Sequence, residues 1–301
     1  MRPLDYKLIH AFDVVLNEQS FDKAADKLNI TQSAVSQRIK QLEQFVSQPV
    51  LIRGTPLAAT SVGEKLLQHF RQVRQLEYDL IKHILPEEAE STVQISIAVN
   101  ADTLASWFIP ALTPLLKKYP IALKLQVCDE TRTKNLLKKG EVFAALSSQS
   151  ESFTGCKVQE VGLVDYILCA TPDFKARYFA KGLNQQTLKR APSVEYDQQD
   201  TMHSDYIESY FHLKAADYPS HVVRSSEAFV TMALAGVAYC LLPHTQANEY
   251  LADGRLVDLA PKHHLQRNLY WHSWVLERGL HKKVSQSLVE FGRNLLNYKM
   301  T

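Results

Sequence analysis

The chain has 301 residues, enough for two or three domains of ordinary size, and 46% of them are hydrophobic, which suffices for a packed core. Its 34 Lys and Arg against 32 Asp and Glu give a net charge of +2, which excludes a non-specific polycation. No run of 18 apolar residues occurs, and the start, MRPLDYKLIHAF, lacks the apolar region of a signal peptide. We therefore expect a cytoplasmic protein without a membrane partner.

The first 46 residues predict three helices. Apolar side chains at helical spacing in residues 5–16 indicate a first helix that closes a small core. Residues 20–46, SFDKAADKLNITQSAVSQRIKQLEQFV, indicate two more helices separated by a tight break. Small Ala24 and Ala25 would let helices approach closely, and Thr31 is placed to cap the last one. This spacing is typical of a helix-turn-helix.

The polar face of that last helix is the informative one, because its start lacks the strong helix formers that a purely solvated face would favour. Gln and Ser side chains hydrogen-bond base edges, and Lys and Arg neutralise phosphates. A solvated face without function is the alternative. Residues 1–60 hold seven Lys and Arg against six Asp and Glu, so DNA binding would depend on local placement and on a dimer. The candidates for DNA contact on this helix are Gln32, Ser33, Ser36, Gln37, Arg38 and Lys40.

A wing and a long helix follow. Residues 50–53 and 57–59 predict two short strands around Gly54-Thr55-Pro56. Ser61 and Glu64 then have capping-box spacing at the start of the helix. Packing on the chain's own wing domain could bury its apolar stripe, but we favour the identical helix of a second copy. The stripe consists of Val62, Leu66, Phe70, Val73, Leu80 and Ile84, and residues 86–90 read as a linker.

From Thr92 onward, strands and helices alternate, which predicts a mostly parallel α/β fold. In such folds, ligands bind beyond the carboxyl ends of the strands. The expected strands are residues 93–99, 121–128, 141–146, 164–170, 193–196, 221–224 and 238–243, and the expected helices are residues 104–119, 133–139, 202–211 and 228–234.

Polar residues gather after these strands. Any one of them could be a helix N-cap, and both roles can coexist because helix N-termini attract carboxylates. The excess of acid is harder to explain by capping, and it suits a cationic amino acid. Ser225, Ser226 or Thr103 would offer donors to the α-carboxylate of such a ligand. The candidates are Asn100, Asp102, Thr103, Asp129, Glu130, Ser147, Asp197, Ser225, Ser226 and Glu227.

Other residue types give no sign of catalysis. Cys128, Cys169 and Cys240 lie in apolar runs and are expected to be buried free thiols, and Cys156 also lacks a CxxC partner. Trp107 is expected to pack a helix onto the sheet. No G-x-S-x-G, HExxH or P-loop occurs, and the histidines have no ligand set at recognisable spacing. We therefore expect neither an enzyme, nor a metal site, nor a resident cofactor.

The motif TQSAVSQRIKQLE (residues 31–43), preceded by SFDKAADKLNI, resembles the N-terminal signature of LysR-type transcriptional regulators. With NADTLASWFIPAL, DETRT, SSEAFV and LYWH, the chain is similar over nearly its whole length to a branch that responds to lysine and arginine. The resemblance implies an α/β multidomain fold. A winged helix-turn-helix would occupy residues 1–60 and a dimerisation helix with a hinge residues 61–90. An effector domain like a periplasmic solute-binding protein would occupy residues 91–301, with lobes of about 91–164 plus 266–301 and 165–265.

The resemblance also implies a function. It adds Arg53 as a basic wing residue, and it implies a sequence-specific regulator of amino-acid transport or metabolism genes. The partners would be double-stranded DNA, a second copy in a homodimer or dimer of dimers, and RNA polymerase, with L-lysine or L-arginine as effector. An architectural or replication-control DNA-binding protein is the alternative. Ligand-dependent DNA binding distinguishes the two.

Overall fold

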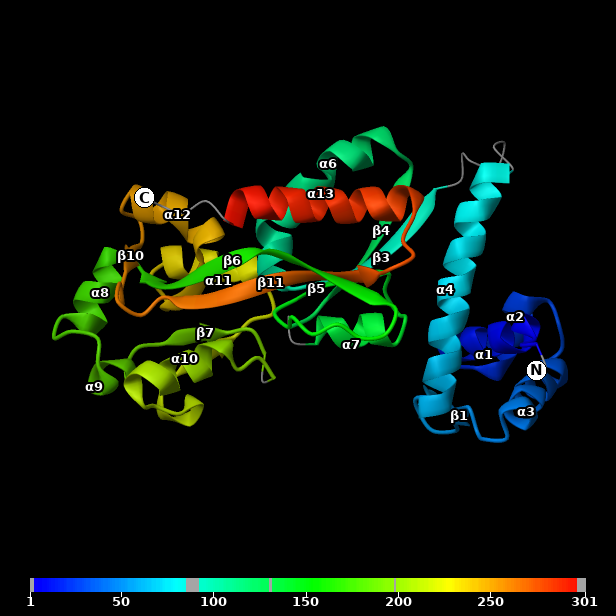
Figure 1. Ribbon diagram of the computed structural model, residues 1–301. Helices are drawn as coiled ribbons and strands as arrows, with labels where there is room; N and C mark the ends of the chain where they lie inside the picture. Colours follow the sequence, from blue (N-terminus) through cyan, green and yellow to red (C-terminus); the bar gives the residue numbers. More distant parts are fainter. Residues whose placement is uncertain (1–2, 85–91, 130–131, 198, 297–301) are drawn as a thin grey trace. The chain divides into compact units, whose positions relative to one another are not determined.

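The computed structural model describes residues 3–84, 92–129, 132–197 and 199–296, and it divides into two compact units (Figure 1). The N-terminal unit comprises residues 1–91 with 135–143, and the C-terminal unit comprises residues 92–134 with 144–301. No helix within the described ranges is long and apolar enough to cross a membrane. The expected linker at residues 86–90 lies outside the described residues, and the domain boundaries stay predictions.

The N-terminal unit is built on the three expected helices. Ile9, Phe12, Val35, Ile39 and Leu42 meet in its core with essentially no exposed surface. This core forms because each helix carries its apolar residues on one face. The elements are α1 (Tyr6–Glu18), α2 (Phe21–Leu28), α3 (Gln32–Val46), β1 (Leu51–Ile52), β2 (Ala58–Ala59) and α4 (Ser61–Ile84).

Side-chain caps fix where these helices begin. Thr31 accepts a hydrogen bond from the Ala34 N–H at 3.2 Å, which confirms the predicted cap of α3. At the start of α4, the Thr60 hydroxyl accepts from the Gly63 N–H at 3.1 Å. Of Thr60 and Ser61, the two residues expected to open this helix, Thr60 is therefore the N-cap, and the capping box expected from Ser61 and Glu64 was wrong.

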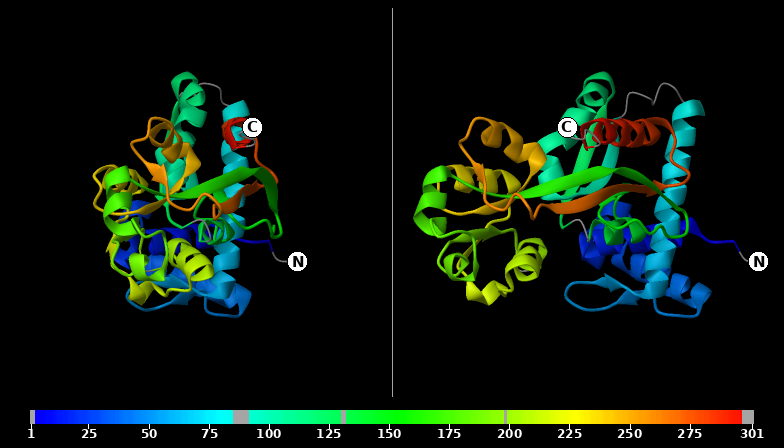
Figure 2. Two further views of the ribbon diagram at one scale, coloured as in Figure 1. Left: turned by 90° about the vertical axis from the view of Figure 1, so that its left-hand side faces the viewer. Right: turned by 60° about the vertical axis from the view of Figure 1, so that its left-hand side comes forward.

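The C-terminal unit is organised around two long strands, β6 and β11, which pair antiparallel (Figure 2). The second half of β11 pairs with β5 of the first lobe. Strand β5 pairs with β3, which in turn pairs with β4. Beyond the last residues of β6 lie β9 and β10 of the second lobe, which also holds the parallel pair of β7 and β8. The strands are β3 (Val93–Val99), β4 (Ile121–Val127), β5 (Ala144–Ser147), β6 (Cys156–Ala170), β7 (Ser193–Glu195), β8 (Ser220–Val222), β9 (Cys240–Pro243), β10 (Val257–Asp258) and β11 (Leu265–Trp274).

Helices cover this sheet system. In Figure 1, α13 runs along the paired strands β6 and β11. The helices are α5 (Ala101–Thr103), the π-helix η2 (Leu104–Phe108), α6 (Ile109–Lys118), α7 (Thr133–Lys138), α8 (Pro172–Phe179), α9 (Gln185–Leu188), α10 (Met202–Phe211), the 3₁₀ turn η3 (Ala215–Asp217), α11 (Ser226–Leu234), α12 (His244–Ala252) and α13 (Gly279–Leu296).

The expectation of a mostly parallel sheet was wrong. The pairs of β3 with β4 and with β5 are parallel, whereas β6 pairs antiparallel with β11, β9 and β10. The alternating order of helices and strands favours parallel pairing only for neighbouring βαβ units. Strand β11 pairs with a strand about a hundred residues earlier in the chain. This long-range pairing leaves no local signal.

Candidate DNA-binding helix and ligand pocket

Helix α3 presents the predicted polar face to solvent. Gln32, Ser33, Gln37 and Lys40 are exposed, whereas Ser36 and Arg38 are partly buried. The opposite face of α3 is buried in the three-helix core. Because the core fixes one face and Thr31 fixes the first turn, the N-terminal turn of α3 is held with Gln32 and Ser33 on its exposed side, where Gln32 donates to the Ser36 hydroxyl at 3.4 Å and the Ser33 hydroxyl lies 2.9 Å from that of Thr31. The helix therefore has the form of a recognition helix.

The predicted wing is shorter than expected but has the expected pairing. Leu51 lies opposite Ala59, and Ile52 lies opposite Ala58, in an antiparallel pair. Arg53 follows β1 and is exposed, with its guanidinium 5.6 Å from the centroid of the Phe21 ring. This contact with α2 orients a basic side chain at the tip of the unit's β-hairpin.

In the C-terminal unit, a pocket of about 570 Å³, part of it open to solvent, lies between residues of the two lobes. Its floor includes Tyr166 of β6, the strand shared by both lobes. The first lobe contributes Asn100, Ala101, Asp102, Cys128 and Asp129, and the second lobe contributes Val194, Glu195, Tyr196, Asp200, Met202, His203, Phe229 and Leu241. This is the crevice beyond strand ends in which α/β folds bind ligands.

The lining is acidic. Asp102, Asp129, Glu195 and Asp200 face the pocket, and the described lining includes no Lys or Arg. Burial, followed by the charges of Asp129 and Asp102, raises the pKa of Asp200 to about 6. Burial also raises the pKa of Glu195. Carboxylates whose ionised forms are disfavoured in this way gain most from a cation bound among them.

Asp102 forms a direct contact between the lobes inside this pocket. Its Oδ1 accepts a hydrogen bond from the Ser226 hydroxyl at 2.6 Å, and its Oδ2 accepts from the Tyr166 hydroxyl at 2.8 Å. Burial raises the pKa of Asp102 although both hydroxyl donors oppose that rise, and the charges of Asp129 and Glu227 add to it. Ser226 begins α11 in the second lobe and is almost completely buried.

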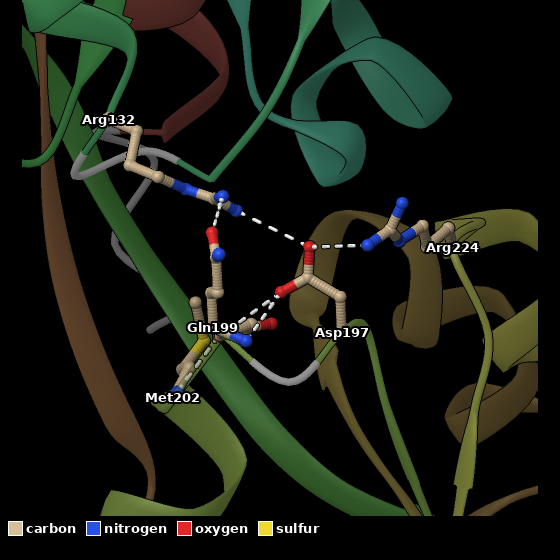
Figure 3. A network of polar contacts seen from close by, with 6 residues as sticks. Arg132, Asp197, Gln199, Met202 and Arg224 are labelled. Carbon is tan, nitrogen blue, oxygen red and sulfur yellow. Dashed lines mark hydrogen bonds and ion pairs between the residues drawn. The ribbon is translucent and has the colours of Figure 1, made fainter.

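Asp197 is held by protein partners in a network of polar contacts (Figure 3). Its Oδ1 accepts from the backbone N–H groups of Gln199 and Asp200 at 2.8 and 3.0 Å. Its Oδ2 lies 3.5 Å from Arg132 Nη2 and 3.6 Å from Arg224 Nη2. Burial alone would raise the pKa of Asp197, but these N–H groups and guanidinium groups together lower it. Asp197 is therefore stably ionised and paired, and it is not among the lining residues.

The remaining described residues that were predicted to bind the ligand are not among those that line the pocket. Ser225 caps α11 by accepting from the Ala228 N–H at 3.2 Å, as its N-cap interpretation predicted. Its hydroxyl also donates to Glu227, which is exposed. Thr103 and Ser147 are buried outside the lining. Glu130 lies outside the described residues.

Three further expectations, on the start of α5, on the cysteines and on Trp107, can be compared with the structure. Asp102 and Thr103 are not N-caps, because they lie inside α5, one turn before the expected helix start. Cys169 and Cys240 are buried free thiols as predicted, but Cys128 is only partly buried and lines the pocket. Trp107 is buried and absent from the pocket lining, so it has a packing role as predicted, but its ring stacks on Phe291 of helix α13 rather than on the sheet.

Sequence reasoning missed most of the second lobe's contribution. Glu195 and Asp200 flank the predicted Asp197 within the segment VEYDQQD, so the density of acid there was a usable signal. Tyr166, Met202 and His203 had no such signal, because they lie inside a strand or helix rather than after one. Among the described residues, no group of three or more His, Cys, Asp and Glu could hold a metal ion.

The helix-turn-helix with its wing and the two-lobed unit with its interlobe pocket together define a ligand-controlled DNA-binding protein. Residues 6–64 match the family described as bacterial regulatory helix-turn-helix protein, lysR family, and residues 88–288 match the LysR substrate binding domain. The chain therefore belongs to the LysR family of DNA-binding transcriptional regulators.

Individual relatives show which members of the family this chain is similar to. The chain is 53% identical to the HTH-type transcriptional regulator ArgP of Aeromonas salmonicida, over 98% of this chain and 99% of that protein. It is 44% identical to ArgP of Proteus mirabilis, over 98% of both chains. These relatives confirm the resemblance to one branch of the family that its motifs indicated.

Solved structures agree with this placement. ArgP from Mycobacterium tuberculosis is similar with a TM-score of 0.86 at 30% identity, over 96% of this chain and 98% of that one. Full-length LysG from Corynebacterium glutamicum with bound effector Arg is similar with a TM-score of 0.81 at 26% identity, over 97% and 99%. The similarity of full-length chains confirms the multidomain architecture.

Proposed function

We propose that L-arginine or L-lysine binds in the interlobe pocket and controls how this regulator acts on its DNA. The observation that carries the proposal is the lining of four carboxylates, Asp102, Asp129, Glu195 and Asp200, among which the described lining places no Lys or Arg side chain. A cationic side chain would offset their mutual repulsion, and a neutral one such as leucine would not. The bound arginine of the structurally similar LysG supports this choice of ligand.

Residues from both lobes would contact one ligand, which gives the pocket a way to act as a switch. A ligand changes a conformational equilibrium only if it binds the two conformations unequally. Asp102 on the first lobe and Asp200 on the second would both be satisfied by a cation only when the lobes are close. Binding would therefore favour a closed arrangement. The genes that respond would be those of amino-acid transport or metabolism.

DNA contact would come from α3 and the wing. Gln32, Ser33, Ser36 and Gln37 would read base edges, while Arg38, Lys40 and Arg53 would pair with phosphates. The exposure of the glutamines and of Lys40 supports this assignment. A ligand pocket would serve no purpose in a purely architectural DNA-binding protein, and no observation supports that alternative.

A second copy would pair through α4. Leu67 and Phe70, in the first half of α4, are buried in the N-terminal unit, but Leu80, Ile81 and Ile84 are 59%, 41% and 62% exposed. Large apolar side chains in a row at helical spacing indicate a partner surface. A homodimer would place two recognition helices on two half-sites, with higher oligomers and RNA polymerase as further partners.

The test is calorimetric titration of the full-length protein with L-arginine, L-lysine and L-leucine, followed by DNA-binding assays with each amino acid. We expect saturable binding of arginine or lysine, no binding of leucine, and a change in DNA affinity or footprint only with the ligand that binds. Equal heats for all three amino acids, or none, would contradict the proposal.

A further inference from the structure

Two polar side chains that line the pocket have buried atoms without a hydrogen-bond partner in the described structure. These atoms are both ring nitrogens of His203, on α10, and Oδ1 of Asn100, immediately before α5. Each residue is only 5% exposed. Buried polar groups in folded proteins are nearly always paired, so unpaired atoms at a pocket wall indicate a partner from outside the chain.

The chemistry of His203 specifies what such a partner must offer. Burial lowers the pKa of His203 to about 4, so the ring is neutral at pH 7 and has one donor nitrogen and one acceptor nitrogen. The ring centroid lies 5.5 Å from that of Tyr239 and 5.9 Å from that of Tyr218. These neighbours hold the imidazole in place, so little ordering would be needed when a ligand arrives.

The two unpaired groups belong to different lobes. Asn100 follows β3 in the first lobe, and His203 lies in α10 of the second lobe. The four carboxylates of the lining supply negative charge, but charge alone does not orient a cation. Neutral acceptors from the two lobes would supply direction, because each accepts from a particular N–H group.

We propose that His203 and Asn100 are specificity-determining residues of the pocket, and that they accept hydrogen bonds from the cationic side chain of the bound amino acid. The inference deepens the proposed function and rests on it. A guanidinium carries five N–H donors and an ammonium three, so either ligand has donors left for these neutral acceptors after pairing with a carboxylate. A neutral aliphatic side chain has none and would leave both acceptors unpaired.

The test compares three variants of the full-length protein by calorimetric titration with L-arginine and L-lysine. In His203→Phe the ring stays aromatic and close in size but loses both nitrogens. In His203→Gln an amide restores a donor and an acceptor. The matched control is Tyr206→Phe, because Tyr206 lies on the same helix and its hydroxyl is also buried and unpaired, yet it does not line the pocket.

Loss of one buried hydrogen bond to a charged group is expected to weaken binding about ten- to a hundredfold. We therefore expect that loss in His203→Phe, partial recovery in His203→Gln and wild-type affinity in Tyr206→Phe. Thermal unfolding and DNA binding without ligand report whether each variant is folded. If His203→Phe does not fold, Asn100→Ala takes its place, because the Asn100 side chain makes no capping hydrogen bond in α5.

The outcomes separate this inference from the proposed function. If the wild-type protein binds neither amino acid, the proposed function fails. If the wild type binds and His203→Phe, or Asn100→Ala in its place, binds equally well, the inference is overturned while the function stands. Equal losses in His203→Phe and Tyr206→Phe would also overturn it, because they would assign the effect of His203 to packing.

Discussion

The hydroxyl of Ser226 donates to Oδ1 of Asp102 at 2.6 Å, although 124 residues separate the two in the chain. Ser226 begins a helix of the second lobe, and Asp102 lies in a short helix of the first. This hydrogen bond connects the two lobes directly at a carboxyl group that lines the interlobe pocket.

Replacing Ser226 by Ala should weaken both the fold and the ligand site. The unfolding free energy should fall by about 1–3 kcal/mol, because the buried Asp102 carboxyl loses a hydrogen-bond donor. Arginine affinity should also fall several-fold, because Asp102 would lose one of the two donors that favour its ionised form. Thermal unfolding and calorimetric titration measure the two effects.

Ser225→Ala is the control for that variant. Ser225 caps α11 but makes no hydrogen bond to Asp102 in the described contacts, so its loss should cost about 1 kcal/mol of stability and leave ligand affinity unchanged. Equal affinity losses in both variants would show that the start of α11, rather than the Asp102 contact, matters.

Ligand affinity should depend on pH through Asp200. Its pKa of about 6 lies above that of an unfolded aspartate, so protonation competes with cation binding in the range just below neutrality. Arginine affinity should be constant above pH 7 and fall as the pH decreases from 7 to 5. Calorimetric titration across this range tests the expectation, and an affinity that rises on acidification would contradict it.

Asp200→Asn should make the protein more stable without ligand and weaken its binding of arginine. A carboxyl group with a raised pKa in the folded state makes the protein less stable as pH rises from about 4 towards 6, since the folded form binds the proton more tightly. The amide keeps an oxygen for the Met202 N–H, which Asp200 accepts at 3.0 Å. We therefore expect a higher melting temperature at pH 7.5 without ligand, together with about tenfold weaker arginine binding.

Charge on the exposed part of α4 should disrupt self-association. Leu80→Glu with Ile84→Glu places two carboxylates on the exposed apolar surface without touching the buried Leu67 and Phe70. We expect monomers in sedimentation velocity at micromolar concentration, with an unchanged fold of the N-terminal unit. Lys65→Glu, at an exposed position of the same helix, should leave the oligomer intact. A wild-type protein that is already monomeric would refute the α4 interface.

Residues on α3 should divide into base-reading and phosphate-pairing groups. Gln37→Ala should cost about 1–3 kcal/mol in specific binding and little in non-specific binding, since an amide reads a base edge. Lys40→Ala should weaken specific and non-specific binding equally. It should also reduce the slope of log affinity against log salt concentration by about one. Fluorescence anisotropy with operator and scrambled duplexes measures both.

The control for the α3 variants is Lys189→Ala, which removes an exposed charge from the second lobe. It should leave both affinities and the salt dependence unchanged. If Gln37→Ala lowers specific and non-specific binding by the same factor, Gln37 does not read a base edge.

The sequence alone determined the features that depend on neighbours within a few turns. Thr31 caps α3, Ala24 and Ala25 are buried, and α10 has the bounds that its pattern predicted, because capping and helical periodicity are properties of adjacent residues. The acidic character of the interlobe pocket was also predictable, since Asp102 and Asp129 follow strands that pair side by side and in parallel.

Only the tertiary structure decided which of the polar residues share a pocket. Asp197 is paired with two arginines, while Asp200, three residues later, lines the pocket, and no local pattern distinguishes the two. His203 and Asn100 line the same pocket although about a hundred residues separate them, and the antiparallel pairing of β6 and β11 joins the lobes that carry them. Such long-range strand pairing is fixed by the packing of the whole domain, which a reading of neighbouring residues does not contain.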